Sequence, residues 1–466
     1  MQLTRSIMAL AVAATLSACS STGIMSQDGS LEQIQDTHQK YEEITKQYQV
    51  NDQWWLGYND QQLNRLVEMA LINNINLAKA AISVNTAYYK ANLVGANLVP
   101  AFSGSVGASA SKGVGSANVN AVSTGVSKVA EQLGFNMSYT LDLWGRLRNA
   151  ASASEWEYKA TQEDLQAAKL SLINSVISSY YNLAYYNNAI QIMQKSIKHY
   201  EQISRIQSNK LNAGMIDRLS VEQSLQATLS AKNTLLSLQT AQKATEQTLR
   251  NLLNLKPNEP LAVKYPNILN VKLQGVNTNV PVSVIANRPD VVASLQRLQS
   301  AFKSLTAMEK SWFPTLTLGA SLSSSAAKVS NVTDNQVAGG SISFDLPFLN
   351  WNTVQNNIKI SEESYKLAKL NYEQTITASL NEIDTYYSSY QLSRSSYANL
   401  QQRYEHDKKI TTYYKNRYDQ GVAEFRDWLN AINTERNSEL SLLETKYTIL
   451  RTENAVYQAM AGKYRR

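Results

Sequence analysis

One stretch of this chain, residues 339–421, constrains its fold more than any other. It begins with alternating polar and apolar residues from Ser341 to Leu346, and Pro347 follows. No further proline or glycine occurs before Gly421, and apolar residues recur there at intervals of three and four. Alternation is typical of a half-buried strand, whereas the three-four spacing is typical of a coiled helix. At about 1.5 Å per residue this helix would extend for roughly 100 Å, far beyond the needs of one globular core.

The same order of segments occurs twice along the chain. Each half is predicted to contain a helix, an alternating hairpin, a long helix and, after a glycine, another helix. The leading helices are expected at about 60–98 and 285–313, and the hairpins at about 101–143 and 315–346. Agreement in order and spacing across independent anchors indicates an internal two-fold repeat. The anchors include three matched pairs: Asn73 with Asn287, Pro100 with Pro314, and Gly214 with Gly421.

The first eighteen residues have the form of a bacterial targeting segment. Arg5 supplies the basic region, residues 7–16 are apolar, and the sequence Leu-Ser-Ala-Cys then ends at Cys19. This looks like a lipoprotein cleavage box, so we expect Cys19 to carry S-diacylglycerol and N-palmitoyl groups. Ser20 instead of aspartate favours the outer membrane. The alternative is an ordinary signal peptide with an incidental cysteine. Since Cys19 is the only cysteine, a disulfide within the chain is excluded.

These features divide the chain into five parts. Residues 1–18 are the signal peptide, and residues 19–59 are a lipidated, extended segment. The remaining parts are repeat 1 at 60–260, a polar linker at 261–281 and repeat 2 at 282–462.

Composition argues against several classes of protein. The net charge of +7 is mild and, without the signal peptide, falls to about +6; because no run of basic residues is present, we expect no nucleic-acid binding. No other stretch approaches eighteen consecutive apolar residues, so no transmembrane helix is expected in the mature protein. The three histidines show no metal-ligand spacing, and no catalytic motif is visible, so neither a metal site nor an enzyme is predicted.

The hairpin strands have the length and pattern of membrane strands. Each is about ten residues long, enough for a tilted strand to cross a bilayer. A soluble hairpin against a core would show the same alternation. If the strands do span a membrane, four cannot close a barrel, and open edges are not tolerated in lipid. Several chains must then contribute strands to one barrel; this argument does not fix their number.

Taken together, several motifs resemble the TolC-like outer-membrane efflux proteins, and most closely their lipidated branch. The resemblance covers essentially the whole mature chain. The fold it implies is mainly α with membrane β: a homotrimer with a 12-stranded β-barrel and a periplasmic α-barrel. The implied function is the exit duct of a tripartite multidrug pump, with a periplasmic adaptor and an inner-membrane RND-type transporter as partners and no cofactor. The motifs are Cys19 with its box, Asp52 to Trp55, Arg288 to Val291, Trp312 to Pro314, Phe344 to Pro347 and Arg417 to Gly421.

The resemblance also implies a gate just after the second repeat glycine. Family members carry acidic residues six and nine positions after it; here these are Asp427, which is kept, and Asn430, which departs from the pattern. Both lie on one helix face. In a trimer an inward Asp427 would form a ring of like charges that favours cations, and Asn430 puts tight cation binding in doubt. Tyr418 and Lys446 match positions that link neighbouring helices and hold the pore shut. A solvated helix face is the alternative for all four.

Two other classes of protein remain to be weighed. A periplasmic coiled-coil adaptor or scaffold lipoprotein would explain the long helices and Cys19, but not two charge-poor amphipathic hairpins at equivalent places in a repeat. A cell-wall hydrolase on a lipid anchor would need an acid, base or nucleophile constellation, and none is visible. The sequence does not identify the exported compounds; antibiotics, detergents, dyes, fatty acids and metal ions all stay open.

Overall fold

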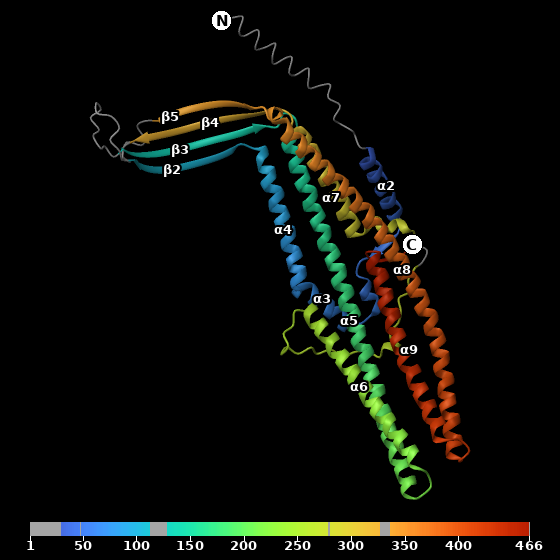
Figure 1. Cartoon of the computed structure of the whole chain (residues 1–466). Coiled ribbons are helices and arrows are strands. Elements are labelled where there is room, and N and C mark those ends of the chain that lie inside the picture. Colours follow the sequence, from blue (N-terminus) through green and yellow to red (C-terminus); the bar gives the residue numbers. More distant parts are fainter. Residues whose placement is uncertain (1–28, 47, 112–127, 278–279, 327–335, 466) are drawn as a thin grey trace, which may run out of the picture.

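The computed structural model describes residues 29–46, 48–111, 128–277, 280–326 and 336–465. Within these residues the chain forms long helices, with a four-stranded sheet projecting from their upper ends (Figure 1). The two repeats follow one order of elements. In repeat 1 these are α3 (Gln61–Asn73), α4 (Ile75–Gly95), β2 (Ala101–Ser111), β3 (Lys128–Leu141), α5 (Arg146–Asn212) and α6 (Arg218–Leu252). In repeat 2 they are η4 (Val282–Asn287), α7 (Pro289–Lys310), β4 (Thr315–Ala326), β5 (Gln336–Asp345), α8 (Trp351–Asp419) and α9 (Phe425–Ala459).

The four strands form one antiparallel sheet in the order β2-β3-β4-β5. Because successive side chains of a strand point to opposite faces, the register gathers apolar residues on one face and small polar residues on the other. Apolar side chains are highly exposed in the single chain: Phe102 is 76% and Val106 86% exposed. One apolar row across three strands comprises Tyr139, Leu318 and Ile342, and the adjacent polar row Ser138, Gly319 and Ser341.

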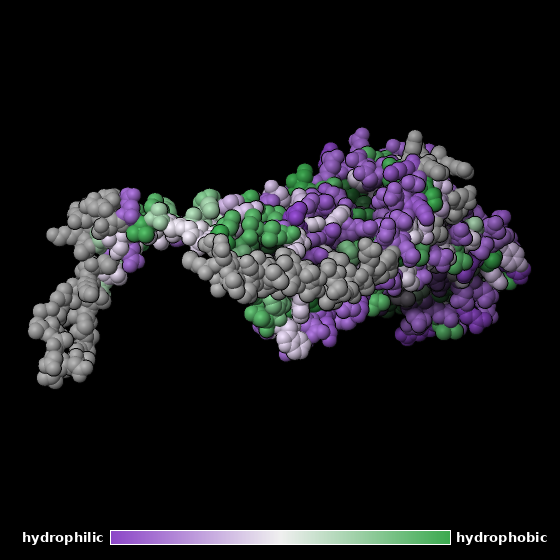
Figure 2. Space-filling view, turned by 90° about the horizontal axis from the view of Figure 1, so that it is seen from above, coloured by the Kyte–Doolittle hydropathy of each residue, from purple (hydrophilic) through white to green (hydrophobic). Residues whose placement is uncertain are grey.

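The helices form an arc that continues from the sheet. α4 packs on α5, α5 on α7 and α7 on α8, so α4 and α8 are the ends of the upper arc. Lower down, α6 packs on α5, while α9 packs on both α5 and α8. Seen from above, hydrophobic residues gather where the sheet joins the helices, and hydrophilic residues cover most of the helical part (Figure 2). No helix among the described residues is both long and apolar enough to cross a membrane.

The segment before residue 59 differs from the expectation of an extended chain. Residues 29–45 form α2 (Gly29–Thr45), a helix whose Leu31 is buried with Leu298 of α7 and Tyr365 of α8. Leu31 and Ile34 lie three residues apart, which puts them on one helix face. The prediction of an extended segment is therefore wrong here, because this short apolar stripe was hidden among polar residues.

The expected boundaries of the helices also need two corrections. The first predicted helix is broken at Asn74, whose side chain caps α4 by accepting from Leu77 N at 3.0 Å. The helix predicted from residue 285 starts four residues later, because residues 282–287 form a 3₁₀ turn before Pro289. Proline at the first helical position is favoured, since its missing N–H has no partner there in any case.

The segment between the repeats packs on the core instead of hanging free. Ile268 is fully buried, and the Glu453 carboxylate of α9, also fully buried, accepts hydrogen bonds from Gly275 N at 2.7 Å and from the Tyr58 hydroxyl at 2.7 Å. Burial, followed by the negative charge of Glu453, raises the pKa of Tyr58 well above its ordinary value. This network joins the N-terminal segment, the linker and the last helix.

The two ends of the described chain meet in a short sheet. β1 (Gln49–Asn51) pairs antiparallel with β6 (Lys463–Arg465), so Val50 lies opposite Tyr464. Gly462 precedes this strand with a φ of 149°, and a Cβ there would lie 2.7 Å from the Val50 side chain. Glycine is therefore required for the close approach of the two segments.

Candidate functional site

The lower ends of the two helical hairpins are built alike. Gly214 follows α5 with a φ of 68°, and Gly421 follows α8 with a φ of 73°, both in the left-handed region that glycine tolerates. In each turn the next N–H reaches back to close the helix, from Met215 to Lys210 O and from Val422 to Arg417 O, both at 2.9 Å. The predicted glycine breaks are thus helix caps that reverse the chain within a few residues.

Tyr418 connects the two repeats just above these turns. Its hydroxyl accepts a hydrogen bond from Lys210 Nζ at 3.0 Å and lies 2.9 Å from Nε2 of Gln207, and both partners belong to α5. The Tyr418 ring stacks on Trp428 of α9 with centroids 5.2 Å apart, and Lys210 Nζ lies 4.5 Å above the Tyr418 ring. Since Gln207 is fully buried, this contact is a desolvated link between α5 and α8.

A second polar link joins α5 to α9. The Tyr200 hydroxyl donates to Asn433 Oδ1 at 2.6 Å and also contacts the Arg436 guanidinium, which lies 5.0 Å from the centre of the Tyr200 ring. Burial raises the pKa of Tyr200, although the positive charge of Arg436 opposes that shift. Nearby, burial lowers the pKa of His199, whose ring meets the edge of Trp428.

Asp427 and Asn430 lie together, as their spacing predicts. Both line a cavity of about 270 Å³ between α8 and α9. Asp427 is in the first turn of α9, where a negative charge is favoured by the helix dipole, and its carboxylate lies 4.0 Å from Arg426 Nε. The side chain of Asp427 is 40% exposed, so its carboxylate remains accessible to water and ions.

A second carboxylate of this cavity was missed by the sequence reasoning. Asp407 of α8 also lines it, is only 8% exposed, accepts from the Ser438 hydroxyl and lies 3.6 Å from Arg403 Nε. Gln207 and Lys210, the partners of Tyr418, were missed as well. These two residues lie seven and four positions before Gly214, more than 200 residues before Tyr418, and no local sequence signal pairs them with it.

The structure does not bring Lys446 to the other three predicted gate residues. It lies sixteen residues beyond Asn430 on α9, about 24 Å along the helix. Lys446 is buried with its Nζ 5.7 Å from the centre of the Tyr397 ring of α8, and burial lowers its pKa. It connects two neighbouring helices, but far above the turn. Cys19, the predicted lipidation site, lies outside the described residues.

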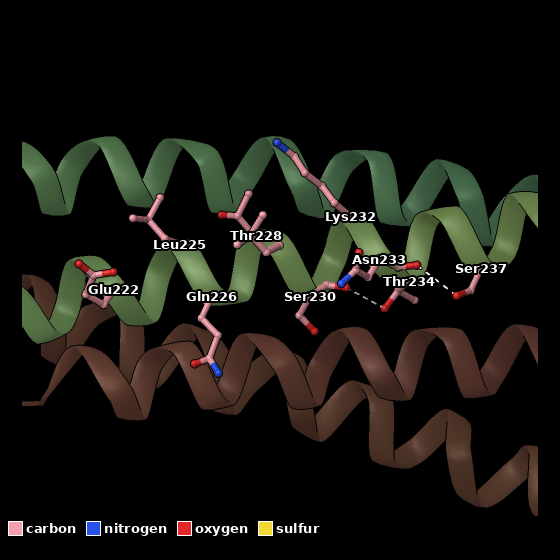
Figure 3. A pocket seen from close by; sticks show the side chains of 10 residues that line it. Glu222, Leu225, Gln226, Thr228, Ser230, Lys232, Asn233, Thr234 and Ser237 are labelled. Carbon is pink, nitrogen blue, oxygen red and sulfur yellow. Dashed lines mark hydrogen bonds between the residues drawn. The ribbon is translucent and has the colours of Figure 1, made fainter.

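One face of α6, which includes Leu225 and Leu229, carries a groove of about 880 Å³. Figure 3 shows its lining side chains along α6, with α5 running beside that helix. Lys232 reaches Glu201 of α5 at 2.9 Å, whereas Leu225 and Leu229 are 44% and 62% exposed. This face of α6 is therefore partly apolar and uncovered in the single chain.

Comparison with known proteins identifies the family. A family model described as "Outer membrane efflux protein" matches residues 66–255 and 280–462. The chain belongs to the outer membrane efflux protein family. The chain is 52% identical over 455 residues to "Toxin and drug export protein A" of Aggregatibacter actinomycetemcomitans, covering 98% of this chain and 97% of that one. It is 25% identical over 419 residues to "Cation efflux system protein CusC" of Escherichia coli strain K12, covering 88% and 89%.

A solved structure supports the fold of this family member. The outer-membrane channel OprN superposes with a TM-score of 0.81 at 20% identity, covering 89% of this chain and 93% of that one. The resemblance to outer-membrane efflux proteins, the predicted combination of long helices with a β-sheet and the assignment as an outer-membrane efflux duct are confirmed. The matched members of this family are outer-membrane channels.

Proposed function

We propose that this chain is the outer-membrane exit duct of a tripartite efflux pump and works as a homotrimer. Each copy contributes four strands to one 12-stranded barrel and its long helices to a periplasmic tunnel. A periplasmic adaptor and an inner-membrane RND-type transporter deliver the cargo, and the duct conducts it passively. The observation that carries this proposal is an amphipathic sheet, in which β2 and β5 are the edge strands of the described residues, continuous with an arc of helices.

The sheet supports closure by further copies of the same chain. β2 and β5 are its edge strands, and unpaired N–H and C=O groups are costly in lipid. The chain direction alternates along β2, β3, β4 and β5, so β5 of one copy can pair antiparallel with β2 of the next. Three copies then give 3 × 4 = 12 strands in an all-antiparallel ring. The exposed apolar face would contact lipid, and the serine-rich face would line the pore.

The helical arc supports the same ring. α4, at one end, exposes an apolar stripe in which Ile82 is 63% and Tyr89 68% exposed. α8, at the other end, exposes Leu370 at 61% and Leu392 at 70%. Contact between the α4 end of one copy and the α8 end of the next would bury both stripes. A head-to-tail contact of this kind closes into a ring when the rotation allows it.

The cargo is proposed to be drugs or other small toxic compounds. The relative with 52% identity is named for toxin and drug export, whereas the relative named for cation efflux is only 25% identical. The nine methionines are not clustered in the sequence, so no methionine track for soft metal ions is visible. Neither of these two relatives is named as an adaptor or a scaffold protein.

The anchor is proposed to be lipid on Cys19. The box that ends there is the support for S-diacylglycerol and N-palmitoyl groups, and α2 starts ten residues later on the side of α7 and α8. Labelling of cells with radioactive palmitate tests this point. We expect label on the wild type and none on Cys19→Ser; label retained by the variant would contradict the anchor.

The gate is proposed to lie at the lower hairpin ends. Asp427 and Asn430 would face the constriction, and the Tyr418 link would hold α8 against α5 in the closed state. The support is the shared cavity of the first two residues and the buried hydrogen bonds of the third. Lys446 would fix α8 against α9 above this point.

Deletion of the chain followed by a susceptibility panel tests the proposed function. We expect increased sensitivity to several unrelated drugs or dyes, with the same panel affected when the partner transporter is deleted. Outer-membrane fractionation and heat-modifiable migration should show a trimer in the membrane fraction. A monomer in the soluble fraction, with an unchanged panel, would favour the adaptor class instead.

A further inference from the structure

A polar groove between α7 and α8 is used neither by the gate nor by the sheet. It has a volume of about 700 Å³, and Asp164 of α5 reaches into it. Its size lies within the range of small-molecule sites in proteins, roughly 300–1,000 Å³. The groove combines charged side chains with an apolar patch around Leu367, which is 59% exposed.

Two ion clusters line this groove, each with more carboxylates than guanidinium groups. In the first, Arg288 donates to both oxygens of Asp290, at 3.0 and 2.8 Å, and to Glu382 Oε2 at 2.8 Å. In the second, Arg297 contacts Asp164, donates to Glu157 Oε1 at 3.4 Å, and is 41% exposed. Glu157 lies outside the groove lining, which carries three carboxylates and two guanidinium groups and therefore one net negative charge.

Repeat 1 shows which of these contacts the packing of the helices requires. Arg288 Nη1 donates to Ala459 O at 2.8 Å, and in repeat 1 Asn74 Nδ2 donates to Leu252 O, also at 2.8 Å. Arg288 lies 214 residues after Asn74, the offset of Asn73 and Asn287. Ala459 lies 207 residues after Leu252, the offset of Gly214 and Gly421, so the two contacts occupy matched positions. An uncharged asparagine thus makes the same structural contact.

The other charged groove residues of α7 and α8 have no charged counterpart in repeat 1. At the matched positions repeat 1 has Asn76 for Asp290, Ser83 for Arg297 and Val176 for Glu382. Repeat 1 nevertheless forms the same helix pair, α4 on α5. The helix pair therefore packs without these charges, which favours ligand binding as their role.

The groove and the apolar cluster that holds α2 use different faces of α7. On α7, Val291 and Leu295 belong to the apolar cluster that holds α2, whereas Asp290 and Ser294 line the groove. In the proposed duct α2 must be on the outer wall, because its chain leads to an anchor in the surrounding membrane. The groove then opens to the lumen. The inference rests on the proposed function in this respect.

We propose that this groove is a binding site for amphipathic organic cations passing through the duct. The surplus carboxylate charge attracts the cationic centre, and the apolar patch around Leu367 contacts the hydrophobic body. The guanidinium groups hold the carboxylates in place and are themselves satisfied by them. Anions are disfavoured because the groove lining carries a net negative charge.

Fluorescence titration of the purified trimer with ethidium, a planar organic cation, tests the site. The variant Arg288→Asn, Asp290→Asn, Glu382→Val introduces the residues that repeat 1 has at these positions, and it removes one net negative charge. We expect its ethidium Kd to rise about tenfold, with trimer migration and single-channel conductance retained. Leu367→Ser, at a position exposed in the single chain, should weaken ethidium binding, with trimer migration and conductance checked as for the triple variant. Asp384→Asn, an exposed carboxylate elsewhere on α8, is the matched control and should change nothing.

Unchanged ethidium affinity in the triple variant and in Leu367→Ser would overturn the inference, as would equal binding of anionic fluorescein by the wild type. Absence of ethidium binding to a conducting trimer would also overturn it and leave the duct intact. A chain that forms no trimer and no conducting pore would contradict the proposed function itself, so the two failures are distinguishable.

Discussion

The two repeats have nearly the same local structure but opposite patterns of burial. α6 and α9 each contain 35 residues, and both ends of α9 are 207 residues after those of α6. Yet α5 is buried at many positions from Ala153 to Gln207 and α6 at few, whereas α9 is buried at many and α8 at few. The reason is position: α5 and α9 lie inside the arc, and α6 and α8 at its edges. A repeat fixes the shape of an element, and its neighbours decide which face is functional.

The largest test of this inequivalence uses a matched pair of leucines. Leu443 of α9 is 2% exposed, and its counterpart Leu236 of α6 is 60% exposed. Leu443→Ala should lower the free energy of unfolding by about 2–5 kcal/mol, because it leaves a cavity. Leu236→Ala should change it by less than about 0.5 kcal/mol. Urea unfolding of the detergent-solubilised protein measures both, and equal losses would refute the distinction between edge and interior.

A second matched pair tests the buried network. Glu453 is fully buried and accepts from Gly275 N and the Tyr58 hydroxyl, whereas its counterpart Glu246 is 25% exposed and pairs with Arg250 at 2.8 Å. Glu453→Gln should cost about 1.5–3 kcal/mol, since it removes a charged acceptor from buried donors. Glu246→Gln should cost less than about 1 kcal/mol. Thermal melting followed by circular dichroism compares them; a larger loss for Glu246→Gln would contradict the assignment.

The lower links should affect conduction more than folding. Tyr418→Phe removes the hydroxyl that binds Lys210 and Gln207, and Asp427→Ala removes the proposed charge ring. We expect the double variant to raise single-channel conductance in planar bilayers severalfold. Tyr413→Phe is the control, because that hydroxyl accepts only an exposed bond from Arg417 at 3.0 Å. Unchanged conductance and unchanged drug leakage in the double variant would refute the gate.

The smallest expected effect is a difference between two matched histidines. Burial lowers the pKa of His199, with Lys415 adding to the shift and Glu435 opposing it. The folded state thus binds fewer protons than the unfolded state, and stability should fall as the pH drops below about 6.5. His199→Gln should reduce this loss, whereas His406→Gln, at the exposed counterpart on α8, should not. Melting curves at pH 7.5 and 5.5 give the comparison; identical pH dependence in all three proteins would contradict it.

Much of the fold could be predicted from the sequence, because its signals are local. Alternation gave the four strands, and the glycines at 214 and 421 marked both turns to within a few residues. The partners of Tyr418 could not be predicted, since they come from a helix more than 200 residues away. α2 was missed because its few apolar residues stand among many polar ones and form a stable helix only when α7 and α8 provide a surface. The separation of Lys446 from Asp427 follows from the length of α9, which the resemblance did not convey.

The pairing of β1 with β6 has a consequence for the order of events during biogenesis. Gln49 lies opposite Arg465, so this contact joins residues 416 positions apart. Contacts of such sequence separation form late, because the loop between them must first be ordered. The N-terminal strand β1 therefore cannot pair until the last residues of the chain have been synthesised. A chain that ends before residue 463 would lack the strand that pairs with β1.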